Sequence, residues 1–245
     1  MSETIETIGP VSNRILAALS VEAYQIMLPK MQRITLVFAE HIYQPASIIR
    51  HVYFPESGII SVLSVVDANS KLEVGIVGNE GMVGLPLFLG VKTSNTLALV
   101  QGSGVALQMS AEDFHAECDR SRELPRLLQR FTHSLMTQMS QSAACNRFHQ
   151  TESRLARWLL MTHDRMQRDE FQITQEFLSN MIGVRREAVN RSAANLQKQK
   201  LISYSRGNMK ILNRIGLEQI ACSCYQLIKN EYDNFLNLDL YSALA

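Results

Sequence analysis

The stretch from Ile173 to Gln199 constrains the fold most strongly, because its pattern indicates two short helices joined by a tight turn. Apolar residues recur at helical spacing in its first half, and Thr174 is a suitable N-cap for that helix. Gly183 supplies the turn, since a residue without a β-carbon readily takes a positive φ at a helix C-terminus. The second helix should turn four apolar residues inward: Ala188, Val189, Ala193 and Leu196.

Polar side chains remain on the outer face of the second helix, close to its start. They are Arg185, Arg186, Glu187, Asn190 and Arg191. Arginine can donate two hydrogen bonds to guanine and glutamate can accept one from cytosine, so this is the chemistry of a recognition helix in the major groove. The alternative is a solvated helix face with local ion pairs, and these residues alone do not exclude it.

Positive charge is concentrated around the same stretch, although the net charge of the chain is only +1. Residues 151–215 carry 12 Lys and Arg against 6 Asp and Glu, whereas residues 1–150 carry 11 against 13. Displacement of counterions from phosphates provides much of the affinity for nucleic acids. A basic segment in a nearly neutral protein therefore favours a nucleic-acid partner.

Composition places the chain among ordinary globular proteins, with 46% hydrophobic and 19% charged residues in 245. It has no apolar run of about 18 residues, so we expect no membrane partner. Residues 1–10 lack the basic and apolar regions of a secretory signal, which favours a cytoplasmic protein. The four cysteines are scattered, as free thiols in a reducing compartment would be.

The first half of the chain changes from helical to β character. Residues 12–32 carry a rough helical stripe, with Ser20 as an N-cap candidate. From Ile34 to about Leu107, short β-branched and aromatic runs alternate with turn residues, which indicates an antiparallel sandwich or barrel. The expected turns are Pro55–Gly58, Asp67–Ser70, Gly78–Asn79 and Gly102–Gly104.

A glycine-rich loop interrupts this β region between Gly78 and Gly90. Its exposed backbone N–H groups could bind an anion, which makes Gly78, Glu80 and Gly81 candidates for an effector loop. A plain connection between strands is the favoured interpretation of the same residues.

A long helix is expected from the region of Pro125 to about Gln150, after an N-terminal capping pattern at Ser110. Four apolar residues follow coiled-coil spacing along it: Leu124, Leu128, Phe131 and Leu135. This pattern favours a dimer seam, and the alternative is a helix that packs on its own β domain.

Further elements are predicted before and after the two-helix stretch. Residues 151–165 should form a helix with a core face that includes Leu155, Trp158 and Leu159. Residues 201–212 should form a hairpin with Gly207 and Asn208 in its turn, whose Arg206 and Lys210 could reach phosphates. Residues 215–237 should form one last amphipathic helix.

No metal or catalytic site is predicted. Cys145 and His149 lie four apart on a helix, but two ligands do not make a site. Cys222 and Cys224, placed on one helix, should direct their thiols to different sides. The chain shows no nucleophile–base set, no metal signature and no Walker-type loop, so we expect no enzyme.

Taken together, the chain resembles the Crp/Fnr family of bacterial transcription regulators over about residues 15–222. The most specific match is ITQEFLSNMIGVRREAVNR, with its G-x-x-R-E-x-x-x-R pattern. The resemblance implies an α+β chain: an N-terminal antiparallel β-roll of the cyclic-nucleotide-binding type (residues 12–120), a dimerisation helix (121–150), a winged helix-turn-helix (151–222) and a helical tail (223–245).

The resemblance also implies which residues contact DNA. Arg186, Glu187 and Arg191 correspond to the family's base-reading residues. A second group of residues should contact neighbouring bases or phosphates: Thr174, Arg185, Asn190, Arg206 and Lys210. The implied partner is double-stranded DNA with a palindromic operator of TGTGA-like or TTGA-like half-sites, bound by a homodimer that works with RNA polymerase.

Two departures from the family pattern concern the effector. The region that should hold a phosphate-binding arginine, Gly90–Thr96, has only Lys92, which lacks bidentate geometry, so no cyclic AMP is expected. The first cysteine is Cys118, so no iron–sulfur cluster held by N-terminal cysteines is expected either. The effector stays unknown. The alternative function is a sensory module that binds a cyclic nucleotide or another small ligand without reading DNA.

Overall fold

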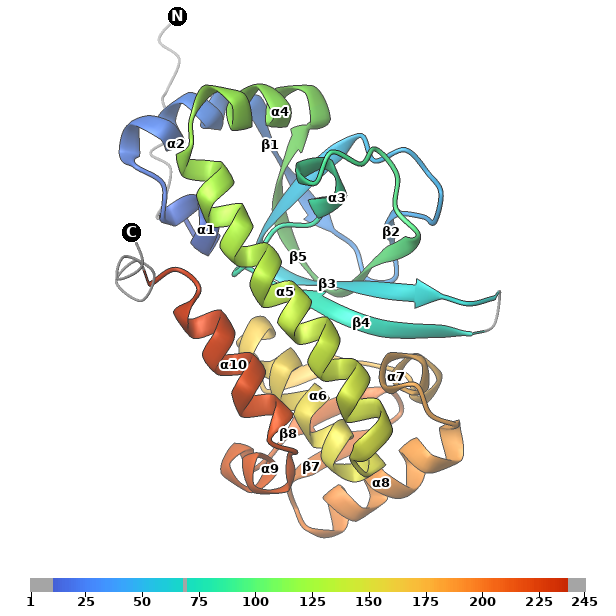
Figure 1. Cartoon of the computed structure of the whole chain (residues 1–245). Helices are drawn as coiled ribbons and strands as arrows, with labels where there is room; N and C mark the ends of the chain where they lie inside the picture. Colours follow the sequence, from blue (N-terminus) through green and yellow to red (C-terminus); the bar gives the residue numbers. More distant parts are fainter. Residues whose placement is uncertain (1–10, 68–69, 238–245) are drawn as a thin grey trace, which may run out of the picture.

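The computed structural model describes residues 11–67 and 70–237. A β domain with short flanking helices lies at one end, a mainly helical domain at the other, and one long helix, α5, runs diagonally between them (Figure 1). The predicted α+β class is therefore confirmed. The secretory-signal prediction on residues 1–10 and the tip of the Asp67–Ser70 turn lie outside the described residues.

The helical stripe of residues 12–32 is two short helices rather than one. α1 (Arg14–Ala17) and α2 (Val21–Met27) are separated by Ser20, and a 3-10 turn follows at Leu28–Lys30. The predicted cap at Ser20 is confirmed, because its side chain accepts a hydrogen bond from the N–H of Ala23.

The β domain is a five-stranded antiparallel sheet that bends on itself, with strand order β1-β5-β3-β4 and β2 paired to β5. Its strands are β1 (Met31–Leu36), β2 (His41–Tyr43), β3 (His51–Val65), β4 (Lys71–Val77) and β5 (Thr96–Ser110). The two longest strands, β3 and β5, pair along most of their length and carry the centre of the core.

Two of the predicted turns lie inside these long strands. Pro55–Gly58 and Gly102–Gly104 face each other across the β3–β5 ladder, where the register shifts repeatedly. Gly58 has φ 82°, and a β-carbon there would lie 2.5 Å from the carbonyl oxygen of Gly102. The turn residues therefore bend a continuous strand pair through bulges instead of ending the strands.

A short helix, α3 (Leu85–Phe88), lies between β4 and β5 in the chain. Three helices then lead from β5 into the second domain: α4 (Ala111–Arg120), α5 (Glu123–Phe148) and α6 (Thr151–Met166). Ser110 caps α4 as predicted, since its hydroxyl accepts from the N–H of Asp113. α6 is the central helix of the second domain. Its predicted core residues Leu155, Trp158 and Leu159 are all buried.

The second domain adds β6 (Glu170–Gln172), α7 (Gln175–Ile182), α8 (Arg186–Lys198), β7 (Ile202–Ser205), β8 (Asn208–Ile211), α9 (Arg214–Ile220) and α10 (Cys224–Asn234). Its small sheet has strand order β6-β8-β7. The predicted hairpin is formed by β7 and β8, but Ser205 pairs with Asn208. The centre of the turn is therefore Arg206 and Gly207, both with positive φ, and not Gly207 and Asn208 as predicted.

The predicted last helix is also two helices. α9 ends at Ile220, and Ala221 (φ −58°, ψ 145°) takes an extended conformation before α10 begins at Cys224. α10 then packs along α5, where the Tyr232 hydroxyl accepts a hydrogen bond of 2.6 Å from the Gln138 amide.

Side-chain contacts dock the second domain onto the β domain. The Trp158 indole donates to Glu73 on β4 at 2.9 Å, and the Gln101 amide donates to the Thr162 hydroxyl at 3.0 Å. The ring centroids of Phe38 and Phe177 are 5.5 Å apart. Among the described helices, none combines the length and the hydrophobicity that a membrane span requires.

Candidate nucleic-acid interface

The two-helix stretch has the predicted local geometry. Thr174 caps α7, because its hydroxyl accepts from the N–H of Phe177 at 3.1 Å. Gly183 follows α7 with φ 62° and ψ 46°, the left-handed conformation that glycine adopts most easily. The turn lets α8 begin at Arg186, directly after Arg185.

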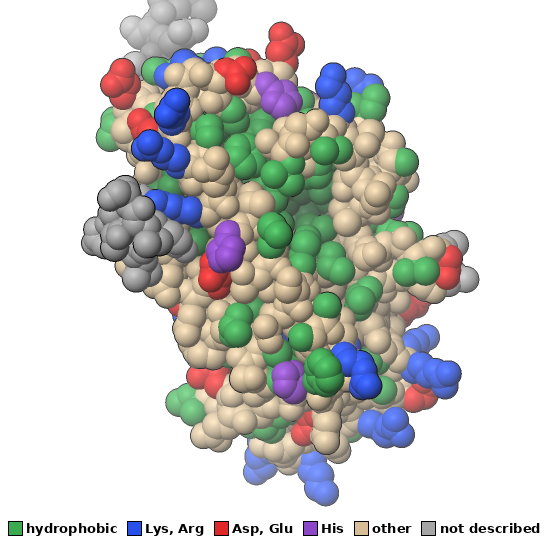
Figure 2. All heavy atoms as spheres, viewed as in Figure 1, with side chains coloured by type: hydrophobic (Ala, Val, Ile, Leu, Met, Phe, Trp, Pro, Cys, Tyr) green, Lys and Arg blue, Asp and Glu red, His purple; other side chains and the backbone are tan. Residues whose placement is uncertain are grey.

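α8 divides into a buried face and an exposed face. Val189, Ala193 and Leu196 are buried against the domain core, and Ala188 is half-buried. All five predicted polar residues are exposed: Arg185, Arg186, Glu187, Asn190 and Arg191. α8 lies at the end of the molecule opposite α2 and α4 (Figure 1), and several Lys and Arg side chains are exposed at this end in Figure 2.

The β7–β8 hairpin stands beside the start of α8. A groove of about 450 Å³ lies between them, and its lining includes Thr174, Arg186 and Arg206. Arg206 is exposed at the tip of the hairpin. Lys210 is exposed as well, but its ammonium lies 2.6 Å from the carboxylate of Glu170, and this hydrogen bond raises the pKa of Lys210.

This arrangement matches a known domain family. Residues 153–220 match the Crp-like helix-turn-helix domain, a range that contains α7, α8 and the hairpin. The chain carries a Crp-like helix-turn-helix domain. The predicted resemblance is thereby confirmed for the part of the chain that holds the candidate DNA contacts.

Solved structures extend the Crp/Fnr likeness in fold to most of the chain. A transcriptional regulator of the Crp/Fnr family from Eubacterium rectale is 16% identical over 84% of this chain and 97% of its own, with a TM-score of 0.65. The c-di-GMP responsive regulator CLP of Xanthomonas campestris is 18% identical over 78% and 99%, with a TM-score of 0.61. FixK2 of Bradyrhizobium japonicum is 12% identical over 79% and 98%, with a TM-score of 0.64. No match was found among proteins of curated function.

The prediction that the apolar coiled-coil residues of α5 form a dimer seam is wrong. The four seam residues are all buried within one chain, at 2%, 0%, 0% and 6% exposure: Leu124, Leu128, Phe131 and Leu135. They pack inside the hydrophobic core of their own chain, which is the alternative considered for this helix. A different stripe of α5 is exposed at alternating spacings of four and three: Gln129, His133, Met136, Ser140, Ala143 and Arg147.

The glycine-rich loop binds a partner within the chain. Glu80 is buried, accepts from the N–H of Gly78 at 3.2 Å and pairs with the Arg165 guanidinium at 2.7 Å. Gly81 packs against the Phe131 ring, because a β-carbon there would lie 2.3 Å from it. These contacts fit the favoured prediction of a structural connection.

A cavity of about 250 Å³ lies next to this loop, between the sheet and α5. Its lining is mostly apolar and includes Val62, Met82, Leu135 and Met139, and none of the described residues that line it is Lys or Arg. Figure 2 shows this face of the molecule hollowed and covered by hydrophobic side chains.

One cluster was missed from the sequence. Cys145, His149, Cys222 and Cys224 lie together, with their ligand atoms within 4.8 Å of one another. The prediction that the thiols of Cys222 and Cys224 point apart is wrong, because Cys222 lies in the break between α9 and α10. The spacing of Cys145 and His149 was a valid signal, and the helix break that completes the set was not recognised.

Proposed function

We propose that this protein is a sequence-specific DNA-binding transcription regulator that binds a palindromic operator as a homodimer. The observation that carries the proposal is the exposed polar edge of α8, formed by Arg186, Glu187 and Arg191, beside a hairpin with Arg206 at its tip. A helix of this kind places the residues near its N-terminus against base edges, while neighbouring cations contact phosphates. Thr174, Arg185, Asn190 and Lys210 serve as the second group of contacts.

The homodimer forms through the exposed stripe of α5 rather than through the buried seam. Met136 is 62% exposed on this stripe, and the small residues Ser140 and Ala143 allow two helices to approach closely. A two-fold dimer presents two copies of α8 to two half-sites, which makes the operator palindromic. The regulator acts on RNA polymerase in the cytoplasm and has no catalytic activity of its own.

Selection from random DNA tests the proposal. The parent protein should return a palindrome, and Glu187→Ala should lose discrimination at one base pair per half-site, at a cost of about 1–3 kcal/mol. Lys198→Ala, at the far end of α8, is the matched control and should return the parent palindrome. Identical palindromes from all three proteins would show that Glu187 does not read DNA, and no enrichment at all would contradict the function.

Binding of a small apolar ligand is a second candidate function. The apolar cavity beside α5 favours such a ligand over a cyclic nucleotide. The cavity has no cation for a cyclic phosphate, and Glu80 is already engaged by Arg165. Cyclic AMP should therefore leave both the melting temperature and operator binding unchanged. Tight saturable cyclic-AMP binding would show that the cavity has been wrongly assigned.

A further inference from the structure

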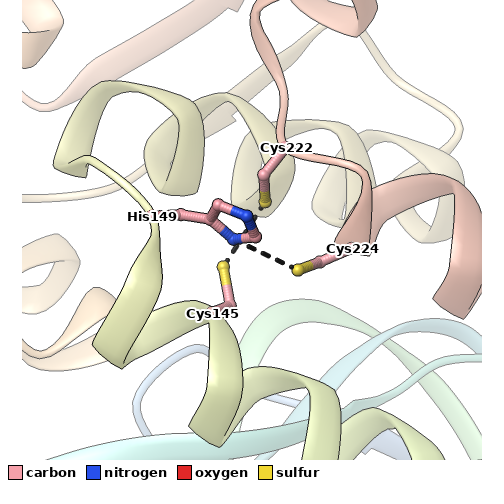
Figure 3. Close-up of side chains that lie close together, drawn as sticks. All are labelled: Cys145, His149, Cys222 and Cys224. Atoms are coloured by element: carbon pink, nitrogen blue, oxygen red, sulfur yellow. Dashed lines mark hydrogen bonds between the residues drawn. The ribbon is translucent and has the colours of Figure 1, made fainter.

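Three cysteines and one histidine meet where the long helix ends. Cys145 is in the last turn of α5, and His149 is the residue that follows α5. Cys222 lies between α9 and α10, and Cys224 is the first residue of α10. Figure 3 shows their side chains pointing toward a common centre from these two parts of the chain.

The distances within this cluster suit a single tetrahedral ion. The sulfur atoms of Cys145 and Cys222 are 3.4 Å apart, and the sulfur of Cys224 lies 3.4 Å from Nδ1 of His149. A zinc ion with Zn–S bonds of about 2.3 Å sets neighbouring ligand atoms about 3.8 Å apart. An iron–sulfur cluster spreads its cysteine ligands over several iron atoms, which needs wider spacing than the observed limit of 4.8 Å.

The surroundings of the cluster suit thiolate sulfurs that are bound to a metal ion. Cys145 and Cys224 are fully buried and Cys222 is 9% exposed, so the thiols lie away from solvent. The Gln141 amide donates a hydrogen bond of 3.1 Å to the Cys224 sulfur, as residues around metal-bound thiolates commonly do.

Two buried arginines lie close to the cluster and leave positive charge without a full set of partners. Arg154 and Arg157 are 5% and 6% exposed, and in each the buried Nε atom has no hydrogen-bond partner among the described residues. The charges of both arginines act on the thiol cluster. A zinc ion with three thiolates and a histidine carries a net charge of about −1, which would offset these buried positive charges.

We propose that Cys145, His149, Cys222 and Cys224 bind one zinc ion that ties the α5–α6 joint to the start of α10. Zinc is the divalent ion that prefers four tetrahedral ligands of this sulfur and nitrogen set, and a fully ligated site of this kind is structural. The ligands come from segments separated by more than 70 residues, so the ion cross-links two distant parts of the chain. Binding releases the thiol protons, and no electron transfer is involved.

The position of the site implies a consequence for DNA binding, which rests on the proposed function. His149 lies between the proposed dimerisation helix α5 and α6, the first helix of the DNA-binding domain. Metal bonds at this joint fix the direction in which α6 leaves α5. Because α6 carries the domain that presents α8, zinc should hold the two recognition helices of the dimer at a constant separation.

The metal content of the full-length protein, purified without a histidine tag, tests the site directly. The parent protein should hold one zinc per chain after dialysis, and Cys145→Ser and Cys224→Ser should each lose it. Cys118→Ser is the matched control, because Cys118 lies on α4 outside the cluster, and it should keep its zinc. Cobalt substituted for zinc should give the visible absorption of tetrahedral thiolate-bound cobalt in the parent and the control only.

A variant with a smaller effect on folding keeps the test decisive. His149 is only half-buried, so His149→Gln should fold and still change the cobalt spectrum and weaken zinc retention against a chelator. The site is overturned by a parent protein without zinc, by zinc that remains in Cys145→Ser, or by a cobalt spectrum that His149→Gln leaves unaltered. Iron and sulfide in place of zinc, or a Cys145–Cys222 disulfide in the fresh protein, would also overturn it.

Operator binding separates the two proposals. Removal and return of zinc should abolish and restore tight binding to the selected operator. If zinc binds at the cluster and its removal leaves operator affinity unchanged, the coupling to DNA binding is overturned while the site stands. If the zinc-loaded protein selects no DNA, the proposed function fails, and the metal content still decides the site.

Discussion

The Arg165 guanidinium donates a hydrogen bond of 2.7 Å to the Glu80 carboxylate, and the two side chains are only 8% and 6% exposed. Arg165 belongs to α6 of the DNA-binding domain, and Glu80 to the glycine-rich loop of the β domain. A buried ion pair therefore joins the two domains at the loop that the sequence made a candidate for effector binding. The Arg165 guanidinium also lies over the Tyr232 ring at 5.2 Å, which adds α10 to the same contact.

Breaking this pair from one side should strongly destabilise the docked domains. Glu80→Met or Arg165→Met leaves one buried charge without its partner, which costs about 3–5 kcal/mol of unfolding free energy. The double variant Glu80→Met/Arg165→Met removes both charges and should lose much less than the sum of the two single variants. Denaturant titration of the four proteins measures this coupling, and additive losses would show that the contact does not join the domains energetically.

A second contact between the domains should depend on pH. Burial raises the pKa of Glu73 on β4 to about 7, although hydrogen bonds from Ser61 and Trp158 and the charges of Arg157 and Arg165 lower it. Between its ordinary pKa of 4.5 and its raised pKa, Glu73 therefore holds a proton in the folded state that it has lost in the unfolded state. Unfolding free energy should therefore fall as the pH rises from 6 to 8, by about 1 kcal/mol from this group.

Glu73→Gln should remove that part of the pH dependence while it keeps a similar shape. Glu112→Gln changes an exposed carboxylate on α4 and is the matched control. Urea titrations at pH 6 and pH 8 compare the three proteins. Equal pH dependence in the parent and Glu73→Gln would assign the effect to another group.

Local signals in the sequence were sufficient for the two-helix stretch that holds the candidate DNA contacts. Thr174 and Gly183 act within a few residues of their own positions, so a cap and a left-handed turn could be predicted without tertiary information. The inward face of α8 followed from helical spacing in the same way. The exposed positions of Arg186, Glu187 and Arg191 are the complement of that face.

Features that depend on distant partners were predicted less well. Coiled-coil spacing at Leu128 and Phe131 identifies an apolar face but not its partner, which is the core of the same chain. Gly58 and Gly102 indicated turns that end strands. In the structure they lie opposite each other on β3 and β5, where they bend the continuous strand pair. The cysteine cluster required both the break before α10 and the packing of that helix near the end of α5.

The proposed dimer interface makes a prediction about the outer stripe of α5. Met136→Glu combined with Ala143→Glu places like charges opposite each other across a two-fold helix contact, and the protein should dissociate into folded monomers. Leu227→Glu is the matched control, because Leu227 is an exposed apolar residue on α10. Sedimentation should give a monomer for the first variant and a dimer for the control. A dimer in both would place the interface elsewhere.

The hairpin should contribute phosphate contacts through Arg206 more than through Lys210. Arg206 is exposed in the turn, whereas Glu170 already compensates the charge of Lys210 at 2.6 Å. Loss of one phosphate contact lowers the slope of log K against log salt concentration by about 0.9. Arg206→Ala should therefore reduce this slope by about 0.9 per chain without changing the selected palindrome, and Lys210→Ala should reduce it less. Operator titrations at several salt concentrations measure both, and a larger effect from Lys210→Ala would show that Glu170 releases it on DNA.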